Sequence, residues 1–194
     1  MGRNHGRAPI CRRNLLRTLD MQNVTETLGI GSRAPEFRLG AANSSLFQTL
    51  GEWTAKGPVV LEFLRGTWCH NCRKRLPELE TLQTTLWADG ANLVCIAAEK
   101  RDGIWKPEEY LREHRISFPF LLDEDRSVIK AYGLYHRVGI DAWNIAHPAT
   151  LVIDRDNRVR YIYKAVGQSD RAPVDEVLKA VKKLASGARA AASP

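Results

Sequence analysis

The sequence predicts an α/β fold with a central mixed β-sheet flanked by helices and a C-terminal β-hairpin followed by a helix. Apolar runs of strand length alternate with segments whose apolar residues recur at helical spacing. Near the end, strand-like runs at residues 149–153 and 159–163 flank the turn signal Asp154-Arg155-Asp156-Asn157, which predicts an antiparallel hairpin. The 194 residues are 44% hydrophobic, which is enough for one sizeable core.

The individual elements follow from local patterns in chain order. Residues 31–58 indicate an irregular lead-in, and residues 59–64 form the nearly continuous apolar run of a central strand buried on both faces. An amphipathic helix follows. Its apolar face consists of Leu76, Leu79, Leu82 and Leu86. The further expected elements are a strand at 91–98, a helix at 107–114, a strand at 118–122, a short helix at 126–132 and, after the hairpin, a helix at 174–184.

Charge and composition divide the chain into a basic leader at residues 1–30, one folded domain at 31–186 and a tail at 187–194. We expect the leader and the tail to be disordered. The formal net charge is +7, and the first twenty residues supply +4 of it through five arginines against Asp20. The remaining charge is spread out, so we expect no nucleic-acid partner. Met21 follows closely, which leaves an overlong start and an organelle-targeting segment as alternatives for the leader.

Apolar stretches and cysteines in the sequence indicate the cellular location of the protein. No apolar stretch approaches the roughly 20 residues of a membrane span, and the leader lacks the apolar core of a secretory signal, so we expect no membrane association. Four cysteines are too few and too unevenly spaced for a disulfide framework. We therefore expect a reducing, cytoplasmic location, in which disulfide formation is transient and catalytic.

The candidate reactive residues are Cys69 and Cys72, in the run Trp68-Cys69-His70-Asn71-Cys72. This run lies between the expected strand at 59–64 and the amphipathic helix that follows it. Positions i and i+3 face the same side of a helix, so the two thiols can close a disulfide with little backbone movement. Free backbone N–H groups and the helix dipole favour a thiolate on Cys69, which we expect to be the more exposed nucleophile, with Cys72 as the resolving thiol. Nearby positive charge comes from His70, Arg73, Lys74 and Arg75. The residues that we expect to tune the thiolate are His70, Arg65, Thr67 and Arg73.

Two other interpretations of this pair are a zinc half-site and unconnected core cysteines. A structural zinc site usually needs four ligands, and the sequence has no second Cys-x-x-Cys or His-x₃-His, so we expect no metal. Cys95 lies inside an apolar strand, where a free cysteine usually behaves as a small hydrophobe. Cys11 lies in the leader and is expected to be incidental.

Three features carry a family resemblance. Trp68 precedes the first cysteine, Pro77 lies five residues after Cys72, and the run at residues 147–154 begins with His147-Pro148. With these features the sequence resembles the redoxin branch of the thioredoxin-like superfamily, which includes AhpC/TSA (peroxiredoxin-like) proteins and thiol-disulfide oxidoreductases. The match in order and spacing covers residues 31–184. It implies a thioredoxin-like fold that works without a resident cofactor.

The resemblance also implies particular site residues. Pro148 would be the family's cis-proline, which lies beside the dithiol and binds extended substrate together with Trp68 and His147. His147 would tune the thiolate, or would simply be exposed. Glu62 lies close to the family's buried acid beneath the second cysteine and could accept its proton; the alternative is a salt-bridged carboxylate, with Arg65 as the partner.

The resemblance leaves peroxide and disulfide substrates open. Peroxiredoxins carry Pro-x-x-x-Thr/Ser-x-x-Cys and a distant arginine, but the proline position here is Glu62, the hydroxyl position is Gly66 with Thr67 next to it, and Pro148 takes the arginine position. Arg65 is a candidate substitute. We therefore predict a disulfide reductase first, an antioxidant peroxidase second, and a non-enzymatic metal- or partner-binding module third. Both enzymes require an external thiol reductant, such as a thioredoxin or glutathione system.

Overall fold

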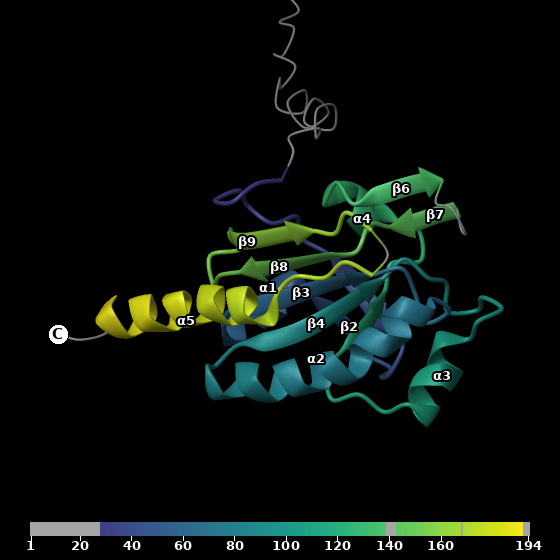
Figure 1. The fold of residues 1–194 in the computed structure, drawn as a ribbon, viewed down its shortest axis with the longest axis horizontal. Coiled ribbons are helices and arrows are strands. Elements are labelled where there is room, and N and C mark those ends of the chain that lie inside the picture. Colours follow the sequence, from purple (N-terminus) through teal and green to yellow (C-terminus); the bar gives the residue numbers. More distant parts are fainter. Residues whose placement is uncertain (1–27, 139–142, 168, 192–194) are drawn as a thin grey trace, which may run out of the picture.

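The computed structural model describes residues 28–138, 143–167 and 169–191. Seven strands form one mixed sheet in the order β2-β1-β5-β4-β3-β8-β9, and β6 pairs with β7 in a separate ribbon (Figure 1). The strands are β1 (Arg38–Ala41), β2 (Phe47–Thr49), β3 (Val59–Leu64), β4 (Asn92–Ala97), β5 (Phe120–Leu122), β6 (Tyr135–Val138), β7 (Trp143–Ala146), β8 (Ala149–Ile153) and β9 (Val159–Lys164). The helices are α1 (Leu50–Lys56), α2 (His70–Ala88), α3 (Pro107–Glu113), α4 (Ser127–Ala131) and α5 (Val174–Ala191). This architecture confirms the predicted fold class.

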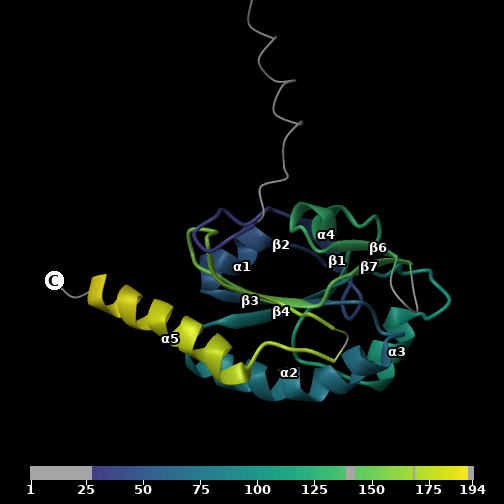
Figure 2. The ribbon, with the colours of Figure 1, turned by 45° about the horizontal axis from the view of Figure 1, so that its top comes forward.

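Helices cover both faces of the sheet. Figure 2 shows α2, α3 and α5 on one side and α1 and α4 on the other. Each side has its own apolar core: Leu79 of α2 and Val177 of α5 pack in one, and Leu50 of α1 and Ile129 of α4 pack in the other. Strand β3 supplies alternating residues to both cores and is buried at every position, as its apolar run predicted.

The lead-in at 31–58 is more regular than predicted. It contains β1, β2 and α1, and β1 extends the sheet by pairing with β5. The short strands have too few apolar residues to show a clear period, which hid them in the sequence. The start of α1 is fixed by a capping box, in which Thr49 and Glu52 exchange side-chain-to-backbone hydrogen bonds.

The other elements lie close to their predicted positions, with two differences. Helix α5 continues past 184 to Ala191, because its last part is rich in alanine, the strongest helix former; the predicted tail boundary at 187 thus falls within a helix. The β6–β7 ribbon was not predicted. The leader residues 1–27 lie outside the described residues. Among the described residues, no helix has both the length and the apolar character that a membrane span requires.

The turn before β3 has a steric requirement that can be tested. A Cβ at Gly57 would collide with the backbone carbonyl of Gly90, in the turn between α2 and β4. We expect Gly57→Ala to lower the free energy of unfolding by about 1–3 kcal/mol, measured by urea denaturation. Gly167→Ala is the matched control, because a Cβ there meets no atom within 4 Å and should change stability by less than about 0.5 kcal/mol. Equal effects of the two substitutions would contradict this account.

Candidate active site

The dithiol lies at the edge of the sheet where β3 ends. Cys69 caps the N-terminus of α2, and Cys72 lies in its first turn. Because β3 and β4 are parallel, their C-terminal ends coincide, with Leu64 level with Ala97. The antiparallel β8 begins at the same edge, where Ala149 pairs with Phe63. The sheet therefore brings together the loop before Cys69, the residues after β4 and the residues before β8.

The two sulfurs are free thiols with unequal affinities for a proton. The hydrogen bond from Cys72 is the main cause that lowers the pKa of Cys69 to about 5, and backbone N–H groups and Arg65 act in the same direction against the cost of burial. The same hydrogen bond, burial and the charge on Cys69 raise the pKa of Cys72. Both side chains are buried, with 4% of Cys69 and 2% of Cys72 exposed, so Cys69 is the more exposed of the two, as predicted, but only slightly.

Arg65 is the cation beside the reactive sulfur. Its Nη1 donates to Cys69 Sγ over 3.8 Å, and its guanidinium lies 4.7 Å from the centre of the Trp68 ring. Only 1% of Arg65 is exposed, so its charge acts in a poorly hydrated environment. Trp68 is half-buried and holds Arg65 in place. This position agrees with the predicted role of Arg65 in tuning the thiolate.

Glu99 is a site residue that the sequence analysis missed. Its carboxylate accepts hydrogen bonds from the backbone N–H of Thr67 at 2.7 Å and from the Thr67 hydroxyl at 2.9 and 3.0 Å. Burial raises the pKa of Glu99, and these hydrogen bonds oppose the rise. A signal was present, because Glu99 closely follows the strand parallel to β3 and so lies at the catalytic edge.

Arg73 braces the same loop from α2. Its Nε donates to the backbone oxygen of Thr67, and its guanidinium lies 4.7 Å from the centre of the Tyr110 ring on α3. These contacts make Arg73 a support for the loop and connect it with α3. His70, the first residue of α2, is exposed.

Glu62 is held in a buried network under α2. Its Oε1 lies 3.3 Å from Nε of Arg75, and its Oε2 accepts a 2.6 Å hydrogen bond from the Thr150 hydroxyl. The salt-bridged alternative for Glu62 is thus observed, but with Arg75 in place of Arg65 as the partner. Arg75 lies one helical turn beyond Cys72 on the buried face of α2. Burial raises the pKa of Glu62, and Arg75 partly offsets the rise. These contacts favour a structural role for Glu62; proton transfer from Cys72 stays a prediction.

The His147-Pro148 segment differs from the expectation. The peptide bond before Pro148 is trans, so the cis assignment was wrong. A trans bond is the intrinsically preferred form, and here it fits backbone hydrogen bonds on both sides, from His147 N to Leu134 O and from Ala165 N to Pro148 O. His147 is exposed and stacks on His136, with ring centres 4.4 Å apart. Pro148 is buried at the start of β8, on the edge where the dithiol lies.

Cys95 lies in β4, fully buried and level with Glu62. Burial is the main cause that raises its pKa, which leaves an unreactive thiol. In the parts of the chain that the structure describes, no three His, Cys, Asp or Glu side chains gather in a way that would hold a metal ion.

The effect of Arg65 on the thiolate can be measured. Because a guanidinium beside the sulfur favours the charged form, we expect Arg65→Met to raise the pKa of Cys69 from about 5 by about 1–2. The measurement is the ultraviolet absorbance of the thiolate in the reduced protein as a function of pH. Arg155→Met, on the remote β8–β9 turn, is the control and should leave the midpoint unchanged. An unchanged midpoint in Arg65→Met would show that another group stabilises the thiolate.

The structural importance of Glu62 is also testable. Glu62→Gln leaves the charge of Arg75 buried without its buried counterion, so we expect the free energy of unfolding to fall by about 3–5 kcal/mol in urea denaturation. Glu78→Gln removes the exposed partner of the same arginine and should cost less than about 1 kcal/mol. Similar losses in the two variants would refute the idea that the buried pair is the important one.

Comparison with known proteins agrees with this geometry. The chain matches the AhpC/TSA family over residues 30–162. Thiol-disulfide oxidoreductase ResA of Bacillus thuringiensis subsp. konkukian is 27% identical over 156 residues, which cover 80% of this chain and 80% of that protein.

Solved structures share the fold. Peroxidoxin BcpB from Mycobacterium tuberculosis is similar with a TM-score of 0.66 and 21% identity, over 82% of this chain and 97% of that one. A peroxiredoxin-like protein from Aquifex aeolicus gives a TM-score of 0.69 and 17% identity, over 81% and 88%. Because the family match spans well over half of the chain and the fold agrees, the protein belongs to the AhpC/TSA family of the thioredoxin-like superfamily.

Proposed function

We propose that this protein is a thiol-disulfide oxidoreductase that reduces disulfides with the Cys69–Cys72 dithiol. The observation that carries the proposal is the position of the two free thiols, Cys69 at the N-cap of α2 and Cys72 in its first turn, which places a resolving thiol next to the attacking one before any substrate arrives. The similarity to thiol-disulfide oxidoreductase ResA supports the same reaction class.

The reaction has two steps. The Cys69 thiolate attacks one sulfur of the substrate disulfide, forms a mixed disulfide and releases the other substrate sulfur as a thiolate. Cys72 then loses its proton and attacks the Cys69 sulfur, which releases the second substrate thiolate and leaves a Cys69–Cys72 disulfide. The substrate gains two electrons, and an external thiol reductant restores the dithiol.

The shared hydrogen bond also sets the order of these steps. Before attack, the charge on Cys69 keeps the proton on Cys72. Once the mixed disulfide forms, that charge and the acceptor of the hydrogen bond are gone, so two of the causes that raise the pKa of Cys72 disappear. Burial remains. Cys72 therefore becomes a nucleophile only after Cys69 has reacted.

Two contacts weigh against peroxide as the main substrate. A peroxidase needs a hydroxyl that is free to orient the peroxide at the sulfur, but the hydroxyl of Thr67 is taken up by both oxygens of Glu99. In addition, the position of the peroxiredoxin proline is occupied by Glu62, which is committed to Arg75 and Thr150.

One contact favours the second candidate, an antioxidant peroxidase. Arg65 lies beside Cys69 Sγ, where it would stabilise charge on the leaving oxygen of a hydroperoxide. In that reaction Cys69 becomes a sulfenic acid, and Cys72 condenses with it to form the disulfide and water.

The cytoplasmic location, and a thioredoxin or glutathione system as the reductant, stay predictions.

The two candidates are separated by stopped-flow fluorescence of the reduced protein. The protein is mixed with hydrogen peroxide or with a model protein disulfide, and Trp68 next to Cys69 reports the reaction. We expect rapid exchange with the disulfide, and oxidation by peroxide no faster than that of a free thiol. Trp68→Phe identifies the signal among the five tryptophans of the chain.

Cysteine variants complete the experiment. Cys69→Ser should abolish exchange, and Cys72→Ser should stop at the mixed disulfide with the substrate. Cys95→Ser is the matched control for a buried thiol and should react normally. Peroxide oxidation orders of magnitude faster than that of a free thiol would overturn the proposal in favour of the peroxidase.

A further inference from the structure

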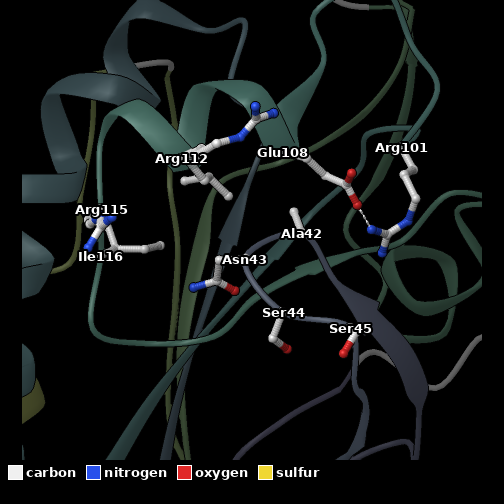
Figure 3. Close-up of a pocket in the computed structure, with 10 residues that line it drawn as sticks. Ala42, Asn43, Ser44, Ser45, Arg101, Glu108, Arg112, Arg115 and Ile116 are labelled. Atoms are coloured by element: carbon white, nitrogen blue, oxygen red, sulfur yellow. Dashed lines mark ion pairs between the residues drawn. The ribbon is translucent and has the colours of Figure 1, made fainter.

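A cavity of about 660 Å³ lies apart from the dithiol, between α3 and the turn at residues 42–45 that follows β1 (Figure 3). Three arginines line it, Arg101, Arg112 and Arg115, against a single acidic residue, Glu108. The turn side contributes Ser44 and Ser45. The lining therefore carries an excess of positive charge together with hydroxyl groups.

The three arginines are not equivalent. Arg101 is neutralised by ion pairs with Glu108 and Glu124 and also donates to the backbone oxygen of Ala41. Figure 3 shows the first of these pairs next to the turn. Among the residues that the structure describes, no carboxylate lies within ion-pair distance of Arg112 or Arg115. Two guanidinium groups at this cavity are thus available for an anionic ligand.

This cavity adjoins a second one that leads toward the dithiol. Arg115 and Ile116 line both, and the second, of about 330 Å³, is also lined by Tyr110 of α3 and Arg73 of α2. Arg73 lies one helical turn after Cys69, and its guanidinium lies over the Tyr110 ring. A continuous line of lining residues therefore connects the arginine cavity with the first turn of the active-site helix.

The sheet gives the separation between cavity and dithiol. Strands β4 and β5 lie between β3, which leads to Cys69, and β1, which leads to the turn at 42–45. Three strand spacings of about 4.8 Å give a sideways separation of about 14 Å. The true separation is larger, because Ala42 bonds to Phe120, which is level with Glu62 and not with the end of β3 at Leu64. An extended peptide needs at least about four residues to cover that distance, whereas a small anion in the cavity would be too remote to take part in exchange at Cys69.

From this arrangement we infer that the arginine cavity docks an acidic segment of a polypeptide substrate, at least about four residues from the disulfide that Cys69 attacks. The inference rests on the proposed reductase function and specifies its substrate class. Carboxylates suit the site because guanidinium groups bind them in paired hydrogen bonds. Such docking raises the rate of association more than it changes the chemistry.

The test uses two synthetic peptides with the same internal disulfide, one with Glu-Glu four residues after the second cysteine and one with Gln-Gln there. Their reduction by the full-length protein is followed by Trp68 fluorescence at low and high ionic strength. We expect the acidic peptide to react about tenfold faster at low salt, and the advantage to vanish at high salt.

The variant Arg112→Gln/Arg115→Gln should lose this advantage and keep the rate of the Gln-Gln peptide. Arg33→Gln/Lys179→Gln removes the same charge from exposed positions away from the cavity and should keep the advantage. Thermal unfolding confirms that both variants are folded.

Other results would overturn the inference. An acidic advantage that survives in Arg112→Gln/Arg115→Gln, or is lost equally in the control variant, would mean that the cavity does not dock the segment. Binding of inorganic phosphate that requires Arg112 and Arg115, without any peptide preference, would identify a small-anion site instead. Failure to reduce either peptide, with rapid oxidation by peroxide, would refute the proposed function itself.

Discussion

Strand β3 is paired on both sides along almost its whole length, with β4 from Val59 to Leu64 and with β8 from Val59 to Phe63. This double pairing fixes where the chain leaves the sheet and enters α2. A register shift of one residue would turn the side chains of β3 to the opposite faces and bury Glu62 in the other core. The position of Cys69 therefore depends on the packing of a strand that ends five residues before it.

Around the dithiol, charges are buried, and each is held by a specific partner. Glu62 is held by Arg75 and Thr150, Glu99 by Thr67, and Arg65 lies against Trp68 and the sulfur of Cys69. Moving charges out of water costs free energy, and pairing them roughly offsets that cost, so these residues contribute little net stability. Their main effect is to fix the positions of the groups around the dithiol. The fold uses them to hold the loop before Cys69 in one conformation, and the low pKa of the thiolate depends on that conformation.

The sequence could predict whatever depends on local pattern. Continuous apolar runs located β3 and β4, leucine spacing located α2, and the i, i+3 cysteines located the dithiol. Partners chosen by tertiary packing were less accessible. Glu62 pairs with Arg75 on α2, although Arg65 lies nearer in sequence. Glu99 contacts Thr67 only because β3 and β4 are parallel. The trans bond before Pro148 was missed because that assignment rested on the family alone.

Burial of Cys69 shapes how substrates can be chosen. With 4% of the residue exposed, Cys69 itself offers a polypeptide very little area for binding. Binding free energy comes from surface that is removed from water when the two molecules meet. Since the sulfur has little such surface, the binding free energy must come from surfaces away from the reacting atoms. Helix α3 provides such a surface: it contacts the active-site helix through Tyr110 and Arg73 and carries the unneutralised Arg112. The dithiol would thus set the order of the chemical steps, while remote charge selects the polypeptide that is reduced.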